Sequence, residues 1–154
     1  MKIQWKKLVI CVAIPLAVGG LASLLTMNGM KEFGNMEQPP LSPPAWLFPV
    51  AWSVLYILMG AACYIVLVAP RRNNDALLAY GVQLFMNFFW TILFFGIGST
   101  LTAFIWLLLL FGAVVWTAVL FFRVDKTAGR LLVPYALWVL FAGYLNLGVY
   151  ILNR

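Results

Sequence analysis

Long apolar runs alternate with short charged segments along the whole chain. A helix of about 20 apolar residues crosses the ~30 Å hydrocarbon layer of a membrane at ~1.5 Å rise per residue. The first and last uncharged stretches each have room for one such helix, whereas the two middle stretches are longer and need separate interpretation. The four stretches without a charged residue are 8–30, 38–70, 76–122 and 131–153.

Proline and glycine divide the two longer stretches. The second opens with Pro39-Pro40-Leu41-Ser42-Pro43-Pro44, which cannot be regular helix because proline lacks the N–H donor and restrains the residue before it. The third is too long for one crossing, and residues 96–100 (GIGST) supply a turn near its middle. The pattern therefore predicts an all-α integral membrane protein, a five-transmembrane-helix bundle in a single domain. The predicted spans are about 8–27, 46–69, 77–96, 101–122 and 131–152, with 28–45 as the first loop.

Composition supports a membrane protein. Of the 154 residues, 65% are hydrophobic and only 9% are charged, against about 25% charged in a typical soluble domain. So few charges cannot cover a soluble surface, and such high apolar content excludes intrinsic disorder. The first apolar run is longer than a signal-peptide core and contains Pro15, so we expect it to be a retained helix.

The cations predict the orientation of the bundle. Positive residues concentrate in cytoplasmic loops, which places the N-terminus inside and the C-terminus outside, with only Lys31 and Arg154 on the outer side. The net charge of +6 therefore reflects membrane orientation, and since no basic stripe follows any segment, no nucleic-acid partner is expected. The bias favours a bacterial cell membrane, with the mitochondrial outer membrane as the alternative. The inner cations are Lys2, Lys6, Lys7, Arg71, Arg72, Arg123, Lys126 and Arg130.

Few residues are available for acid–base or metal chemistry. The chain has no histidine, its four acids all lie in loops, and Cys11 and Cys63 sit inside apolar stretches where we interpret them as buried thiols. We therefore expect no metal site and no required cofactor. Because no predicted span carries an interior charge, the sequence also argues against ion-driven transport.

The third span carries an unusual polar face. Five residues recur at helical spacing and lie on one side of the helix, namely Gln83, Asn87, Trp90, Thr91 and Phe94. Amides in hydrocarbon need partners, so this face is expected to point to other helices or to a cavity. Interhelical hydrogen bonding and ligand binding both remain open from the pattern alone.

The fifth span has a comparable face, on which Tyr135, Trp138, Ala142 and Leu145 line up. An aromatic residue followed one turn later by a small one leaves room for a flat apolar ligand. The same small residue equally allows a neighbouring helix to approach closely. The span alone does not separate these interpretations.

Tryptophan is frequent, with seven in the chain. Trp5 and Trp46 suit the membrane interface. The others fall deeper within spans, where grouped indoles can stack on a planar π-system such as a porphyrin, although core packing or lipid contact explains some of them. These deeper residues are Trp52, Trp90, Trp106, Trp116 and Trp138.

The C-terminal residues fit a loose cholesterol-recognition pattern through Tyr150 and Arg154. Such patterns are weak. An interfacial tyrosine beside a terminal cation explains the same residues without a sterol.

Three separated segments together resemble the tryptophan-rich sensory protein/translocator protein family. They are 43–60 (PPAWLFPVAWSVLYILMG), 83–90 (QLFMNFFW) and 130–146 (RLLVPYALWVLFAGYLN), in the family's order and spacing. The chain departs from the family at Glu32-Phe33 and Leu41, where many members have tryptophan or tyrosine in the first loop. Trp106 stands where an acidic residue is common.

The resemblance implies a five-helix bundle, often dimeric, whose apolar cavity is closed by the first loop. Members of the family bind porphyrins such as protoporphyrin IX and other lipophilic molecules, and in animals cholesterol. Gln83 would help to orient the ligand, and Pro43, Pro44 and Trp46 would connect the lid to the second span. The implied cavity residues are Trp52, Asn87, Trp90, Trp138, Ala142 and Leu145.

The leading functional hypothesis is a membrane receptor or carrier for porphyrins and similar lipophiles, surrounded by membrane lipid and acting as a homodimer. The resemblance also implies an enzymatic alternative, namely light- and oxygen-dependent porphyrin breakdown that uses Trp52 and Trp138. A third hypothesis is a dimeric membrane scaffold or regulator without a ligand.

Overall fold

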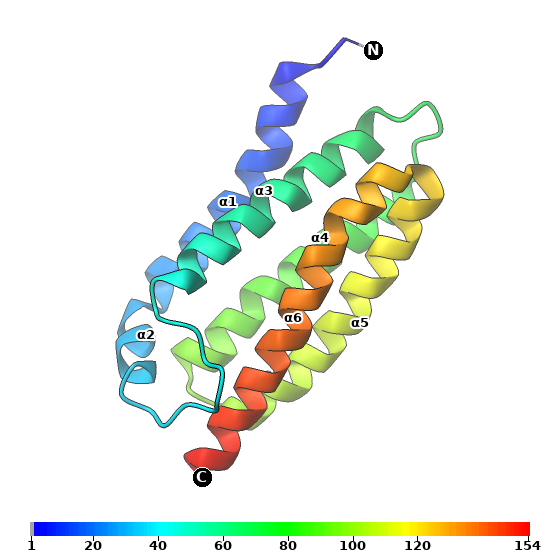
Figure 1. Ribbon diagram of the computed structural model, residues 1–154. Helices are drawn as coiled ribbons and strands as arrows, with labels where there is room; N and C mark the ends of the chain where they lie inside the picture. The colour runs from blue at the N-terminus through cyan, green and yellow to red at the C-terminus, as the bar shows by residue number, and fades with distance from the viewer. Residues whose placement is uncertain (1) are drawn as a thin grey trace.

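Long helices packed side by side make up the computed structural model, which describes residues 2–154 (Figure 1). Five helical segments are long and apolar enough to cross a membrane. The described residues contain no strand. The predicted all-α fold with five spans is thereby confirmed. The elements are α1 (Trp5–Leu25), α2 (Met27–Phe33), α3 (Leu47–Val68), α4 (Asn74–Thr91), η1 (Ile92–Gly96), α5 (Thr100–Val124) and α6 (Lys126–Leu152).

Four of the spanning helices, α1, α4, α5 and α6, begin before the predicted spans do, whereas α3 lies within its predicted span. α6 begins at Lys126, five residues before the predicted start at 131, because Asp125 caps it. The Asp125 carboxylate accepts hydrogen bonds from the backbone N–H groups of Thr127 and Ala128 at 2.7 and 3.1 Å. A cap of this kind satisfies backbone N–H groups of the first turn that have no partner within the helix. The helix can therefore begin among charged residues, before the apolar span.

Glycine lets α1 and α3 approach closely. A Cβ atom at Gly60 would lie within 2.5 Å of the Val12 Cα atom, and one at Gly19 would overlap the ring of Tyr56. At the N-terminal end of α1, the Gln4 backbone N–H donates to the Tyr64 hydroxyl at 2.9 Å. Small residues at such crossings bring helix backbones into van der Waals contact. α1 therefore supports the face of α3 that carries Tyr56.

A π-helical turn, η1, ends the third spanning segment. The backbone N–H of Ile97 donates to the carbonyl of Ile92 at 2.9 Å, and Gly98 adopts φ +71° at the turn that follows. A positive φ is easily adopted by glycine. The GIGST sequence predicted the turn, but nothing in the spacing predicted the wider π-helical winding that precedes it.

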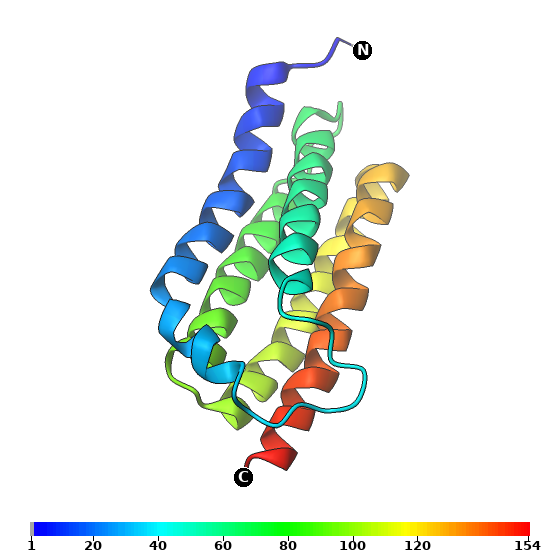
Figure 2. The same cartoon turned by 60° about the vertical axis from the view of Figure 1, so that its left-hand side comes forward.

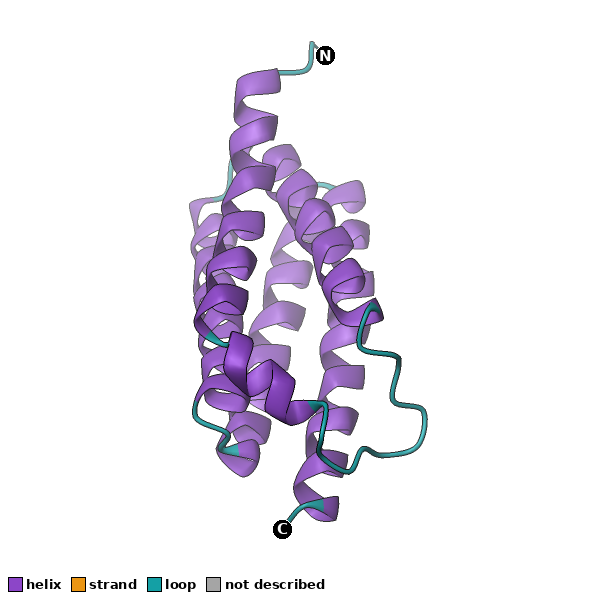
Figure 3. Cartoon of the chain, turned by 90° about the vertical axis from the view of Figure 1, so that its left-hand side faces the viewer, coloured by secondary structure: helices purple, strands orange, loops and turns teal. Residues whose placement is uncertain are grey.

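The connection between α1 and α3 crosses the end of the bundle where the C-terminus lies (Figures 2 and 3). The prediction that 28–45 is a loop was wrong for its first part, because α2 covers Met27–Phe33. Gly29 lies directly against the backbone carbonyl of Phe95, so α2 packs on η1 without an intervening side chain. This short helix depends on tertiary contact, which seven residues cannot reveal in isolation.

The positive-inside bias predicts the orientation of the bundle. A single cysteine in place of Asn35, in the lid, should react with a membrane-impermeant maleimide added to intact cells. A cysteine in place of Asn74, at the start of α4, should react only after the cells are opened. The parent protein with its native Cys11 and Cys63 gives the background. Equal labelling of the two positions, or the reverse pattern, would contradict the N-inside orientation.

Candidate functional site

Trp52 lies at the centre of a group of rings contributed by three helices. Its ring centroid is 5.6 Å from that of Tyr56, 6.0 Å from Trp90, 6.2 Å from Tyr135 and 6.4 Å from Trp138. Aromatic pairs interact favourably over such separations. We call these five residues the aromatic cluster.

The cluster has a buried side and a more open side. Tyr56 on α3, Trp90 on α4 and Tyr135 on α6 are buried. Trp52 on α3 and Trp138 on α6 are half-buried. The structure thus brings together three tryptophans that the sequence predicted deep within spans, Trp52, Trp90 and Trp138. They meet two tyrosines at the same place.

A chain of hydrogen bonds joins α3, α4 and α6 through the hydroxyl groups of two cluster residues, Tyr56 and Tyr135. The Tyr56 hydroxyl donates to Asn87 Oδ1 at 2.9 Å, and Asn87 Nδ2 donates to the Tyr135 hydroxyl at 2.9 Å. The Tyr135 hydroxyl in turn donates to Gln83 Oε1 at 2.8 Å. Both amide side chains are fully buried. The polar face of α4 thus makes the interhelical hydrogen bonds that the sequence left as one of two possibilities.

Two buried N–H donors at the site take no part in these hydrogen bonds. Gln83 Nε2 and the indole Nε1 of Trp138 have no hydrogen-bond partner within residues 2–154. A buried polar group without a partner costs about 1–3 kcal/mol. A bound molecule with a carbonyl, carboxylate or imine acceptor would offer Trp138 the partner that it lacks.

An apolar groove opens between α3 and α6 on the outer surface of the bundle. It is an open depression of about 470 Å³, and Trp138 belongs both to the groove and to the aromatic cluster. The groove walls are apolar side chains of two spanning helices, so they face the hydrocarbon layer. The lining residues are Ala51, Val54, Leu55, Pro134, Leu137, Trp138 and Phe141.

Phenylalanines close the cluster at its lid end. Phe94 stacks on Trp90 with centroids 5.7 Å apart, and Phe48 meets Trp138 edge-on at 6.1 Å. Phe33 of α2 contacts both Phe94 and Phe48, at 5.4 and 6.4 Å. α2 is thereby linked to the cluster through ring-to-ring contacts. A small pocket of about 150 Å³ remains under α2, between α2 and η1.

The other candidate residues divide between the core and the surface. Ala142 and Leu145 are buried on α6. In the lid connection, Trp46 is 65% exposed, Pro44 is exposed and Pro43 is half-buried. At the end of the chain, Tyr150 is half-buried and Arg154 is exposed.

Not every deep tryptophan joins the cluster. Trp116 is 59% exposed on α5, on a lipid-facing surface. Trp106 packs against α4, where its indole N–H donates to the backbone carbonyl of Met86 at 2.8 Å. The indole N–H of Trp90 instead reaches Asn146 Oδ1 at 3.3 Å, which ties α4 to α6.

Sequence reasoning missed the residues that complete the site from other elements. Tyr56, Phe33 and Phe48 were not selected as site residues, whereas Phe94 was placed on the inward-facing side of the third span. Tyr56 and Phe48 lie in a segment that was noted only for its family resemblance, and Phe33 lies in the segment expected to be loop. For Phe48 and Tyr56, which lie four residues before and after Trp52, helical spacing was the available signal, whereas no such spacing pointed to Phe33. Their mutual contact depends on how three helices pack.

Comparisons with known proteins find similar sequences over most of the chain. The family profile described as the TspO/MBR family matches residues 11–152. The chain is similar to the tryptophan-rich protein TspO of Chlorobaculum tepidum, at 37% identity over 99% of both chains. It is 38% identical to the tryptophan-rich protein TspO of Archaeoglobus fulgidus over 96% of this chain and 97% of the relative. It is also 32% identical to the human translocator protein, over 77% of this chain and 73% of that protein.

The hydrogen-bond chain should contribute measurably to stability. Tyr135→Phe removes the hydroxyl that joins Asn87 to Gln83 and leaves two buried amide groups without that partner. We expect the free energy of unfolding in detergent to fall by about 1–3 kcal/mol. Tyr150→Phe, at a half-buried ring near the end of α6, is the matched control. Equal thermal stability of wild type and Tyr135→Phe would show that the chain does not hold the helices together.

Proposed function

The chain belongs to the TspO/MBR family of membrane proteins, and we propose that it is a receptor or carrier for porphyrins, such as protoporphyrin IX, and similar flat lipophilic molecules. The observation that carries this proposal is the aromatic cluster. Trp52 contacts four other rings within 6.4 Å inside a membrane bundle. Large ring faces favour a planar π-system, and burial of an apolar ligand supplies most of the binding free energy.

Binding requires rings of the cluster to separate. Two rings that sandwich a planar ligand need about 7 Å between them, since each contact occupies about 3.5 Å. The centroid separations of Trp52 from Trp90 and Trp138 are 6.0 and 6.4 Å, and the rings are tilted or edge-on rather than parallel. The ligand would therefore replace these ring contacts. The Trp138 side chain has room to move aside for the ligand because it borders the open groove.

The groove supports entry from the bilayer. A lipophilic ligand partitions into the hydrocarbon layer, and the α3–α6 groove connects that layer to Trp138. The unpartnered indole N–H of Trp138 would hydrogen-bond a polar group of the ligand near the groove. The Tyr56–Asn87–Tyr135–Gln83 chain would hold the opposite wall of the site in place during this change.

A second candidate is light- and oxygen-dependent breakdown of the bound porphyrin. It is favoured by the direct contact of Trp52 with both Trp90 and Trp138. In that case the excited porphyrin itself drives the chemistry, and the indoles are the oxidisable groups nearest to it. Mixing the protein with protoporphyrin IX distinguishes the two functions. Saturable tryptophan quenching in the dark indicates binding, whereas a new absorption band that forms only under light and only with intact protein indicates breakdown.

Trp138 should contribute directly to affinity. Trp138→Phe keeps an apolar ring but removes the larger indole face and the N–H donor, so we expect porphyrin affinity to fall by roughly 1 kcal/mol, about fivefold. Trp5→Phe is the control, because Trp5 is 66% exposed at the start of α1. Equal losses from both variants would mean that quenching reports partitioning into the detergent or membrane, and binding at the cluster would be refuted.

Ala142 distinguishes a ligand space from a packed helix contact. It lies one turn from Trp138 on α6 and is buried. If space for a ligand opens at this level, Ala142→Phe should fill it, so that the fold survives and porphyrin binding is lost. If the side chain only packs against a neighbouring helix, overpacking should destabilise the protein by about 1–3 kcal/mol. Thermal stability and porphyrin titration of the same sample decide. Retention of full binding would remove Ala142 from the site.

A further inference from the structure

The lid segment Glu37–Pro40 is held against the outer end of α6 by three adjacent contacts. Asn153 Oδ1 accepts a hydrogen bond from the Glu37 backbone N–H at 3.0 Å, and Asn153 Nδ2 donates to the Glu37 carbonyl at 2.8 Å. The Tyr144 hydroxyl donates to the Pro40 carbonyl at 2.6 Å. These bonds recognise backbone groups of the lid, so they do not depend on its side chains.

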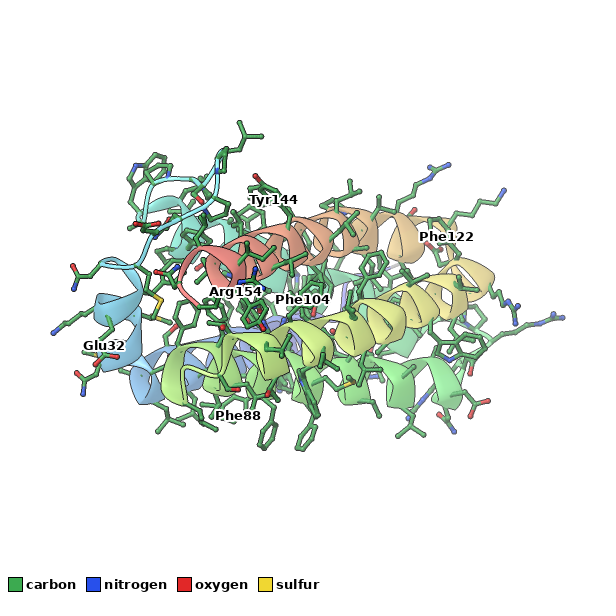
Figure 4. The ribbon with its side chains drawn as sticks, turned by 90° about the horizontal axis from the view of Figure 1, so that it is seen from below. Glu32, Phe88, Phe104, Phe122, Tyr144 and Arg154 are labelled. Carbon is green, nitrogen blue, oxygen red and sulfur yellow. The ribbon has the colours of Figure 1, made fainter. Side chains whose placement is uncertain are left out.

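Besides the contacts with Asn153 and Tyr144, a third contact of the lid segment with α6 is steric. Pro39 is buried, and its ring lies directly on Gly148, where a Cβ atom would overlap it. Tyr144 and Gly148 lie one turn apart on α6, and Asn153 is the residue that caps its C-terminal end, so all three lie close to the end of the helix. Figure 4 labels Tyr144 on α6 at the end of the bundle that carries the lid and Glu32. We call these three residues the latch.

Leu41, the residue directly after the latched segment, is strained. Its φ angle is +67°, in the left-handed region, although its side chain is 84% exposed and packs against almost nothing. A leucine in this conformation costs about 1–2 kcal/mol, because its Cβ atom approaches the following carbonyl. Leu41 lies in a turn in which the backbone N–H and the hydroxyl of Ser42 both donate to the Pro39 carbonyl, at 3.3 and 2.8 Å, so this turn and the latch contacts of Pro39 and Pro40 together hold the residue there.

We propose that the latch and the strain at Leu41 are opposed, and that together they set how often the lid opens and hence how fast a ligand exchanges with the aromatic cluster. Opening frees Leu41 to return to an ordinary φ angle, while closing restores the hydrogen bonds to Glu37 and Pro40. The part of this proposal that concerns ligand exchange rests on the proposed function, whereas lid opening does not. Tyr144, Gly148 and Asn153 are positioning residues, because they act through the lid and not on the ligand.

The lid is linked to the aromatic cluster at both of its ends, so opening of the lid affects the site. Its first part, α2, is linked to the cluster through Phe33, and its last part leads into α3 at Leu47, next to Phe48. Release of Glu37–Pro40 from α6 leaves the lid without its contacts in the middle of the connection. The rings of Phe33 and Phe48, which cover Phe94 and Trp138, are then free to separate.

Hydrogen exchange tests the latch without any ligand. The Glu37 amide is hydrogen-bonded to Asn153, so its exchange rate reports release of the lid. Asn153→Ala should accelerate exchange in the 36–42 peptide by about three- to tenfold, and Tyr144→Phe should do so by about threefold, as expected for lost hydrogen bonds. Exchange within α5 is the internal control and should not change. An unchanged rate at Glu37 in Asn153→Ala would overturn the latch.

Substitutions at Leu41 test the opposing strain and predict the opposite sign. Asparagine adopts the left-handed conformation more easily than leucine, so Leu41→Asn should slow exchange at Glu37 by about threefold. Leu41→Ala is the matched control, because it removes the same exposed side chain but keeps the unfavourable φ angle, and should leave exchange unchanged. If Leu41→Asn and Leu41→Ala behave alike, the strain does not act on the lid.

Porphyrin dissociation then connects the lid to the site. The dissociation of protoporphyrin IX into excess empty micelles should be faster in Asn153→Ala and slower in Leu41→Asn, by factors that follow the exchange rates. Altered exchange with unaltered dissociation would refute control of ligand exchange while leaving the latch intact. Failure of the wild-type protein to bind porphyrin would instead refute the proposed function, and the hydrogen-exchange results would still decide whether the latch exists.

Discussion

The absence of water in the hydrocarbon layer is the constraint on which this structure depends. Buried polar groups therefore depend on partners inside the protein. The Asn87 amide bonds the hydroxyls of Tyr56 and Tyr135, and Gln83 Oε1 accepts from Tyr135, which ties α3, α4 and α6 together at one level of the bundle. Trp52 packs against both of these tyrosines. The hydrogen-bond chain thus fixes the wall on which the aromatic cluster is built.

The cluster has three kinds of neighbour. They are the hydrogen-bond chain, the apolar groove next to Trp138, and the ring of Phe33 on α2, which reaches the cluster through Phe94. A site that binds a large flat molecule without a permanent open cavity needs such an arrangement, because some rings must move while others stay. Membership of the TspO/MBR family agrees with a membrane protein of this kind, and its ligand is the proposal that the ring geometry supports.

Much of the bundle was predictable from the sequence because charge and length decide it. Uncharged stretches of membrane-spanning length gave the five helices, and the spacing of Gln83, Asn87 and Trp90 showed which face of α4 turns inward. The partners of that face were not predictable, since Tyr56 and Tyr135 come from helices whose rotation depends on packing. α2 and the latch were missed for the same reason. Gly29, Gly148 and Asn153 acquire their roles only when distant segments meet.

The most direct test of the central claim is porphyrin quenching in a protein whose only indoles are Trp52, Trp90 and Trp138. This variant replaces Trp5, Trp46, Trp106 and Trp116 with phenylalanine. If the cluster binds the ligand, protoporphyrin IX should quench its emission in the dark, saturably and at one ligand per chain. The complementary variant, which keeps only the other four tryptophans, should show weak and non-saturating quenching. Non-saturating quenching of the cluster indoles, or equal quenching of both variants, would contradict the account.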